Sequence, residues 1–194
     1  MSSLKNRFKR FGLAIGLTAA LAAAIAAPAA AADSVTQSIT PGTRTASVAD
    51  LSFPDIAYSH TAQTPTGSMT LTADDSTGSN AGWNVTIQSS NFVWSAGTGG
   101  ASSGTDIPAA NFSLTSAAAP VATAGQSVDT TGGPKVPTTS PDGTLDTARK
   151  TVQADTTFGN GTYTQALGVS LAIPADSAAG TYTGTLTTTI SAAP

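Results

Sequence analysis

The chain has 194 residues, no cysteine and a formal net charge of −3. Without thiols it can form neither disulfides nor cysteine-ligated metal centres, and thiol catalysis is excluded. Four of the eight basic residues lie within the first ten positions, which leaves four basic residues against eleven aspartates over residues 33–194, a net charge of −7. Nucleic acid is therefore not an expected partner, because binding a phosphate backbone requires clustered Lys or Arg.

The N-terminus is typical of a secretory signal peptide covering residues 1–32. The basic cluster precedes an apolar stretch over 11–27, and Pro28 then breaks the helix. The run Ala29–Ala32 supplies the small residues that a signal peptidase accepts, so we expect cleavage before Asp33. An uncleaved membrane anchor is the alternative for an apolar stretch of this length. The mature chain is expected to be secreted and to work outside the cytoplasm.

Residues 33–194 are expected to form a single all-β domain, an antiparallel β-sandwich or barrel-like fold. Ser and Thr make up about a third of this segment and Glu is absent, so β-branched residues are plentiful where strong helix formers are scarce. Turn signals containing Gly or Pro recur throughout, as in sandwiches and barrels. Since no helix long enough for repeated parallel crossovers is predicted, antiparallel pairing is favoured.

The expected strands, in chain order, are 35–40, 47–53, 68–73, 83–88, 111–115, 150–154, 167–173 and 182–190. Three of them show a clear alternation of apolar and polar residues, which places one set of side chains on a single face. The core-facing residues predicted from these three strands are Trp83, Val85, Ile87, Leu167, Val169, Leu171, Ile173, Tyr182, Leu186 and Ile190.

Two stretches are too polar or too rich in Gly to be predicted as strands. Residues 95–105 are expected to form a Gly/Ser loop, and residues 117–147 a long polar surface loop. The second stretch could instead link two small domains. The strands on either side of it are too few to close a core alone, so we expect one domain.

Two tryptophans could present flat faces to sugar rings. Trp83 alternates in phase with Val85 and Ile87, which favours packing in the core over contact with a ligand. Trp94 precedes a Gly-rich stretch, where packing and exposure are equally consistent with the sequence. Our hypothesis is that Trp94 and the loop Gly97–Gly104 form a glycan-contacting edge.

Oxygen-bearing side chains gather at Asp74, Asp75, Ser76 and Asn80, and calcium accepts ligands of this kind. Asp74 and Asp75 are therefore candidate metal ligands. The spacing does not match an EF-hand loop, and hydrogen bonding within an Asx turn is the commoner use of such residues. No cofactor is expected.

The sequence offers little for catalysis. His60 is the sole histidine and lies in a polar stretch without a nucleophile motif or a second metal-ligating residue nearby. Glycoside hydrolysis needs two carboxylates in different environments, and the scattered aspartates define no such pair. We therefore expect no enzymatic activity.

Two segments together resemble the WxL domain, a surface domain of Gram-positive bacteria. Leu71–Ile87 is similar to that family's strand, Asp-containing turn, Gly-Trp and following strand, and the stretch from Leu171 to Pro194 is similar to its closing hairpin. The name-giving Trp-x-Leu stands here as Trp83-Asn84-Val85. The family has a second Trp-x-Leu near its C-terminus. Thr188-Thr189-Ile190 stands at that place in this chain, so one of the two aromatic signatures is missing.

This resemblance implies a secreted, non-catalytic β-domain that attaches non-covalently to peptidoglycan. The expected partners are peptidoglycan or another wall glycan, and other surface proteins. Residues 190–194 contain neither a sorting motif nor an apolar span, so no transmembrane anchor is expected in the mature chain and retention would depend on its folded surface. The alternative function is a structural subunit of a surface layer, fibre or coat.

Overall fold

The computed structural model describes residues 34–139 and 141–192. The predicted signal peptide therefore lies outside the described residues, and Ile39–Pro194 forms one compact unit. Strands dominate the described part of the chain, where the single helical element is the short 3-10 helix η1 (Ala109–Asn111). No helix within these ranges is long and apolar enough to cross a membrane. The predicted all-β class is confirmed.

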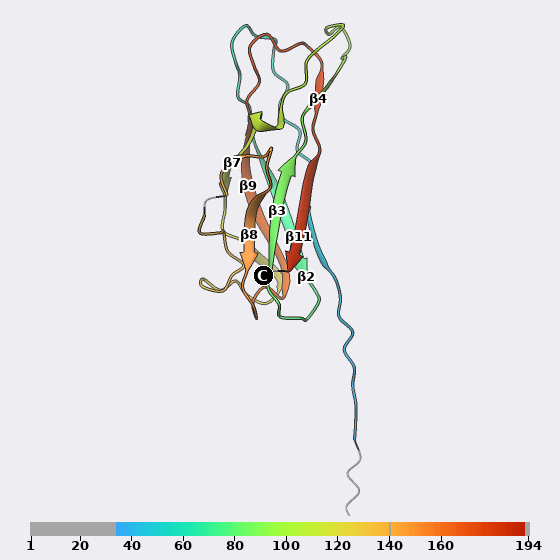
Figure 1. The fold of residues 1–194 in the computed structure, drawn as a ribbon, viewed down its shortest axis with the longest axis vertical. Coiled ribbons are helices and arrows are strands. Elements are labelled where there is room, and N and C mark those ends of the chain that lie inside the picture. Colours follow the sequence, from blue (N-terminus) through green and yellow to red (C-terminus); the bar gives the residue numbers. More distant parts are fainter. Residues whose placement is uncertain (1–33, 140, 193–194) are drawn as a thin grey trace, which may run out of the picture. The chain divides into compact units, whose positions relative to one another are not determined.

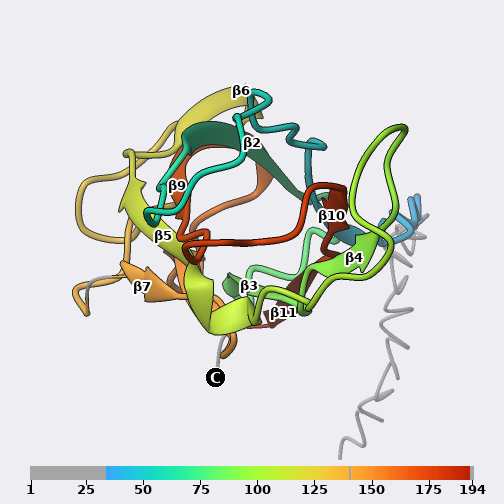
Figure 2. The same cartoon turned by 90° about the horizontal axis from the view of Figure 1, so that it is seen from above.

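Two antiparallel sheets enclose a shared core (Figures 1 and 2). The larger sheet has the spatial order β1 (Arg44–Val48), β2 (Thr66–Asp75), β9 (Gly161–Leu171), β5 (Phe112–Ala117), β7 (Gly143–Thr144), and β6 (Val121–Gly125) also pairs with β9. The smaller sheet has the order β11 (Leu186–Ala192), β3 (Trp83–Ser89), β8 (Arg149–Ala154). A separate two-stranded ribbon joins β4 (Val93–Ser95) to β10 (Thr181–Thr183).

The alternating strands direct one face of each sheet into the core, as their period of two requires. Trp83, Val85 and Ile87 are fully buried, which confirms the predicted inward face of β3. The core also contains Met69, Leu71, Ala73, Ile107, Phe112, Leu114, Leu145, Val152, Ala154, Tyr163, Leu167, Val169 and Leu171. Burying a large apolar side chain contributes about 1.5–3 kcal/mol, so this cluster is the main source of stability.

The last predicted strand is divided in two. Tyr182, Leu186 and Ile190 share the inward, partly buried face as expected, but β10 ends before Gly184 and β11 begins after it. The ring of Phe92 packs against Gly184, where an added Cβ would lie 3.0–3.1 Å from three ring atoms. The division separates the ribbon of β4 and β10 from the sheet below it (Figure 1).

Two predicted strands near the N-terminus differ from the structure. Residues 35–40 form no strand, and Val35 and Ile39 are 99% and 92% exposed. Of the predicted strand 47–53, only Ser47 and Val48 lie in a strand. The observed strand β1 instead begins at Arg44 and pairs with β2 in the register Arg44↔Asp75. The prediction missed this start because the pairing depends on residues some thirty positions away.

The predicted strand-free loop over 117–147 is also corrected. It contains β6, whose small residues pair with β9, and β7, which pairs with β5. Backbone pairing needs no large apolar side chain, so the polar composition of this stretch did not reveal its strands. Leu145 is fully buried as well. Over residues 96–105, by contrast, the predicted Gly/Ser loop is confirmed, since the structure shows no strand there.

Candidate functional site

Trp83 is a core residue, which corrects its candidacy as a glycan contact. Its side chain is 0% exposed, and its ring centroid lies 6.0 Å from that of Tyr163. Its Nε1–H donates to the carbonyl oxygen of Gly159 at 2.8 Å. Gly159 has φ +81°, and a Cβ there would lie 2.6 Å from Trp83 Nε1, so both the backbone conformation and the close approach require glycine. The indole of Trp83 therefore stabilises the core and is not accessible to a ligand.

Trp94 lies in a different environment, on the inward face of the β4–β10 ribbon opposite Tyr182. Its side chain is half-buried, and its backbone N–H donates to Asp106 Oδ1 at 2.9 Å. A Cβ at Gly104 would lie 2.5–2.6 Å from three atoms of the indole, so only glycine fits against the ring. Backbone of the predicted Gly/Ser loop therefore packs directly on the indole of Trp94.

A second glycine completes this cover. Gly180 lies so close to Trp94 Nε1 that an added Cβ would collide with it, and Ala101 N–H donates to the carbonyl of Ala179 at 3.0 Å. We call Trp94, loop 96–105 and turn 175–180 the tip. The sequence hypothesis joined Trp94 to loop 97–104. The structure adds the 175–180 turn, which sequence analysis missed because it is distant along the chain.

The indole N–H of Trp94 has no hydrogen-bond acceptor. Trp94 Nε1 is buried and unpartnered among the described residues. A buried donor without an acceptor costs about 1–3 kcal/mol. Its counterpart on Trp83 has a backbone acceptor. The tip therefore contains an unused donor that a ligand hydroxyl could satisfy if the glycine cover shifted.

Asp74 and Asp75 do not converge on a common point, because successive strand residues point to opposite faces. Asp75 is 3% exposed; its Oδ1 accepts from Thr77 N at 3.0 Å and Thr77 Oγ1 at 2.6 Å, while Arg44 Nε donates to Oδ2 at 3.0 Å. Asp74 accepts from Ser76 Oγ and Thr162 Oγ1, both at 2.7 Å. Over residues 34–139 and 141–192, no three His or Asp side chains are placed to hold a metal ion.

The pKa of the Asp75 carboxyl reflects this arrangement. Burial alone would raise its pKa, but the hydrogen bonds from Thr77 and Arg44 outweigh burial and hold the pKa below its usual value. The carboxylate is therefore ionised at neutral pH and binds its own turn and the adjacent strand β1.

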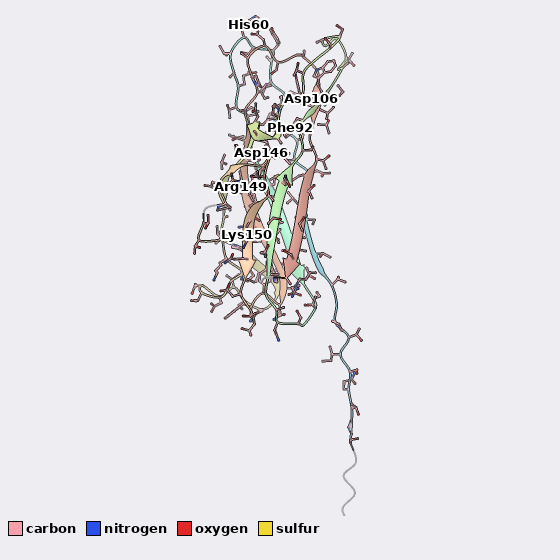
Figure 3. The ribbon with its side chains drawn as sticks, in the orientation of Figure 1. His60, Phe92, Asp106, Asp146, Arg149 and Lys150 are labelled. Carbon is pink, nitrogen blue, oxygen red and sulfur yellow. The ribbon has the colours of Figure 1, made fainter. Side chains whose placement is uncertain are left out.

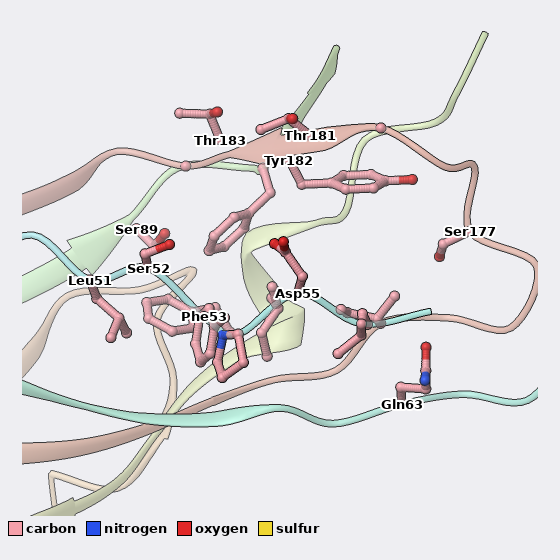
Figure 4. Close-up of a pocket in the computed structure, with 18 of the residues that line it drawn as sticks. Leu51, Ser52, Phe53, Asp55, Gln63, Ser89, Ser177, Thr181, Tyr182 and Thr183 are labelled. Atoms are coloured by element: carbon pink, nitrogen blue, oxygen red, sulfur yellow. The ribbon is translucent and has the colours of Figure 1, made fainter. Parts of the chain in front are cut away.

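A groove of about 990 Å³ lies between two segments that are distant in the sequence. Residues 48–59 form one wall and residues 177–186 the other, and Figure 4 shows Phe53 and Asp55 facing Tyr182 across it. Tyr182 donates its hydroxyl to the carbonyl of Ala178 at 2.9 Å, and burial raises the pKa of this phenol. Sequence analysis did not find this groove, because its two walls are far apart in the sequence.

Asp176, which has φ +58°, lies between the groove-lining residues Pro174 and Ser177. Asp176 Oδ1 accepts from Tyr58 Oη at 3.0 Å and contacts His60 Nδ1 at 2.5 Å. The hydrogen bond to Asp176 raises the pKa of Tyr58, with burial and the negative charge as smaller causes. His60 is thus part of a contact between loops, and among the described residues no hydroxyl nucleophile is bonded to it.

Charge distinguishes this end of the unit from the rest. Among the described residues that line the groove, only Asp50 and Asp55 are charged, and Asp106 accepts a hydrogen bond from the backbone of Trp94 in the tip. Arg149 and Lys150 lie farther from the tip than Asp106 does (Figure 3). Both the groove and the tip therefore favour a neutral or cationic ligand over an anionic one.

One family model matches the chain, over residues 33–194, and its description is "WxL domain surface cell wall-binding". No curated protein and no solved structure matches the chain. The matched region begins at the predicted cleavage position and includes both segments in which the resemblance was recognised.

Proposed function

This chain belongs to the WxL family of surface cell wall-binding domains, and we propose that it binds wall peptidoglycan non-covalently through the tip. The family match places the protein at the cell wall or surface. The observation that supports the tip as the contact is the buried, unpartnered indole N–H of Trp94. It is a donor without an acceptor in a chain whose other tryptophan has one.

The glycan strand is the component of the wall that suits this site. Sugar hydroxyls are acceptors for an indole N–H, and an indole ring supplies the apolar surface on which sugar rings pack. Residues 96–100 and 102–105 of the Gly-rich loop near Trp94 are exposed. The net charge of −7 over residues 33–194 disfavours the anionic polymers of the wall, so the neutral glycan of peptidoglycan is the proposed ligand.

The cover over Trp94 explains how binding could proceed. Gly104 and Gly180 approach the indole through backbone atoms, and both belong to exposed segments of the tip. A glycan that displaces the 175–180 turn gains a hydrogen bond to a donor that has none in the free protein. Binding therefore relieves a cost that the free protein bears.

The proposed activity is binding without catalysis. The family is described as wall-binding, and His60 contacts Tyr58 and Asp176 and no candidate nucleophile in the described chain. Asp106 accepts from the backbone of Trp94, and Asp176 contacts the side chains of Tyr58 and His60. This arrangement supports a structural role for both the imidazole and the carboxylate.

Sedimentation with purified peptidoglycan tests the proposal. Trp94→Ala should lower the affinity at least tenfold, which corresponds to about 1.4 kcal/mol. Val93→Ala is the matched control, because Val93 is 57% exposed on the opposite face of the same strand. Unchanged binding of Trp94→Ala, with a circular dichroism spectrum like that of the wild type, would show that the tip is not the site that binds peptidoglycan.

A second arm identifies the wall component. The mature chain should bind walls from which anionic polymers have been stripped at least as well as intact walls. Loss of binding after stripping would show that the ligand is an anionic polymer and not the glycan.

A further inference from the structure

The segment Ser34–Thr40 has the composition of a strand but no partner. It is uncharged, and the period of two places Val35, Gln37 and Ile39 on one face. Val35 is 99% exposed and Ile39 is 92% exposed. Short uncharged segments of high β-propensity are those that add to an open sheet edge. The sequence predicted a strand here, and the structure shows none within the chain.

The groove offers one unpaired strand edge. The backbone N–H of Trp94 donates to Asp106 Oδ1 and therefore points away from β10. Trp94 and Tyr182, which lie opposite each other, are thus a non-hydrogen-bonded pair of the antiparallel ladder. The N–H and C=O of Tyr182 therefore point away from β4, toward the edge that borders the groove. Among the described residues, no strand pairs with that edge of β10.

The facing wall also has free backbone groups. Residues 50–58 make no backbone–backbone hydrogen bond within the described parts of the chain, whereas Ala49 and Ser59 on either side do. Unpaired N–H and C=O groups on both sides of one groove are the condition for β-augmentation, in which an extended peptide satisfies them. An added strand would have partners on two sides.

The dimensions and the floor of the groove suit such a strand. Seven extended residues span roughly 23 Å, and the walls are formed by continuous stretches of at least ten residues. The lining includes Leu51, Phe53, Phe92 and Ile173, which offer apolar contacts for two β-branched side chains. The segment carries no charge that would oppose Asp50 or Asp55.

A chain cannot fill its own groove with both of these side chains. Ile39 precedes Gly42 by three residues, a reach of about 11 Å, whereas the groove begins at Val48, roughly 20 Å beyond Gly42 along β1. Gly42 is held at the far end of β2 by its bond to the carbonyl of Ser76. Gly42 therefore lies at the end of the unit opposite the groove.

We propose that Ser34–Thr40 of one copy docks as an added β-strand into the groove of a second copy, with Val35 and Ile39 on its apolar floor. A donor at one end and an acceptor at the other form a heterologous contact, which generates an open head-to-tail chain and not a closed dimer. The wall-binding tip of every copy would then be repeated along the assembly, which multiplies its avidity.

The test compares variants of the mature chain by analytical ultracentrifugation over a concentration series. Wild type should show species larger than the monomer that grow with concentration. The double variant Val35→Asp, Ile39→Asp should sediment as a monomer. The double variant Thr36→Asp, Ser38→Asp adds the same charge to the opposite face and should still assemble. Because all four positions are exposed, none of these changes should affect folding.

A second experiment uses a synthetic peptide of residues 34–40. It should bind a chain that begins at Pro41, and it should dissociate wild-type assemblies. A monomeric wild type at every concentration, or equal assembly by the two double variants, would overturn the proposal. Sedimentation with peptidoglycan separates this outcome from the proposed function, because the chain that begins at Pro41 keeps the tip and should still bind the wall.

Discussion

The two tryptophans of this chain lie in regions built on different principles. Trp83 is 0% exposed in the core, and its N–H donates to the carbonyl oxygen of Gly159. Trp94 is half-buried beneath glycine backbone at the tip, and its N–H has no acceptor among the described residues. Residue type alone does not separate these roles. The difference is whether the protein itself satisfies the polar end of the side chain.

This contrast extends to the surrounding structure. Trp83 is surrounded by β3, β8 and β9, whose registers fix its neighbours, and the Arg44–Asp75 ion pair ties β1 to the same end of the larger sheet. The tip and groove are formed by irregular segments whose backbone groups are only partly paired. Regions of low contact density and unpaired backbone open most readily, so the tip is the part of the molecule best able to rearrange around a ligand.

Removal of Trp83 should have the largest effect. Trp83→Ala leaves a cavity in the core and an unpaired carbonyl at Gly159, so the free energy of unfolding should fall by about 3–5 kcal/mol in chemical denaturation. Affinity for peptidoglycan should be unchanged for the fraction that remains folded. A loss of affinity with little loss of stability would reverse the roles assigned to the two regions.

Replacement of Asp75 should have an intermediate effect that depends on pH. Since hydrogen bonds from Thr77 and Arg44 hold the folded pKa of Asp75 below its usual value, the carboxylate stabilises the fold above its unfolded pKa. That contribution is lost as pH falls through the folded pKa. At neutral pH, Asp75→Asn should lower the free energy of unfolding by about 2 kcal/mol.

The stability at acidic pH tests the role of Asp75. The stability difference between wild type and Asp75→Asn should shrink as pH falls below the usual carboxyl range, when measured by urea denaturation. Asp146→Asn is the control, because Asp146 is exposed and accepts one hydroxyl hydrogen bond from Thr144. A difference that stays constant down to strongly acidic pH would show that ionisation of Asp75 does not stabilise the fold.

Calcium should have the smallest effect. The carboxylates of Asp74 and Asp75 are already engaged by Ser76, Thr162, Thr77 and Arg44. Addition of calcium or a chelator should therefore shift the thermal midpoint of a chain of residues 33–194 by less than about 1 °C. A calcium-dependent rise that disappears in Asp74→Asn would restore these residues as a metal site.

Much of the fold could be predicted because β3 and β9 alternate without interruption. The limits arise where a strand depends on a distant partner. The start of β1 at Arg44 follows from its pairing with Asp75, and β6 exists because small residues pair with β9. The site was predicted in part for the same reason. Trp94 and its adjacent loop are local in sequence, whereas the cover by Gly180 is set by the pairing of β4 with β10.

The most direct test of the account replaces each tryptophan by phenylalanine, which keeps an aromatic ring and removes the indole N–H. Denaturation and peptidoglycan affinity should be measured for both variants. Trp83→Phe should lose stability and keep its affinity, and Trp94→Phe should lose affinity and keep its stability. Equal peptidoglycan affinity of Trp94→Phe and wild type would contradict the claim that the unpartnered N–H at the tip binds the wall.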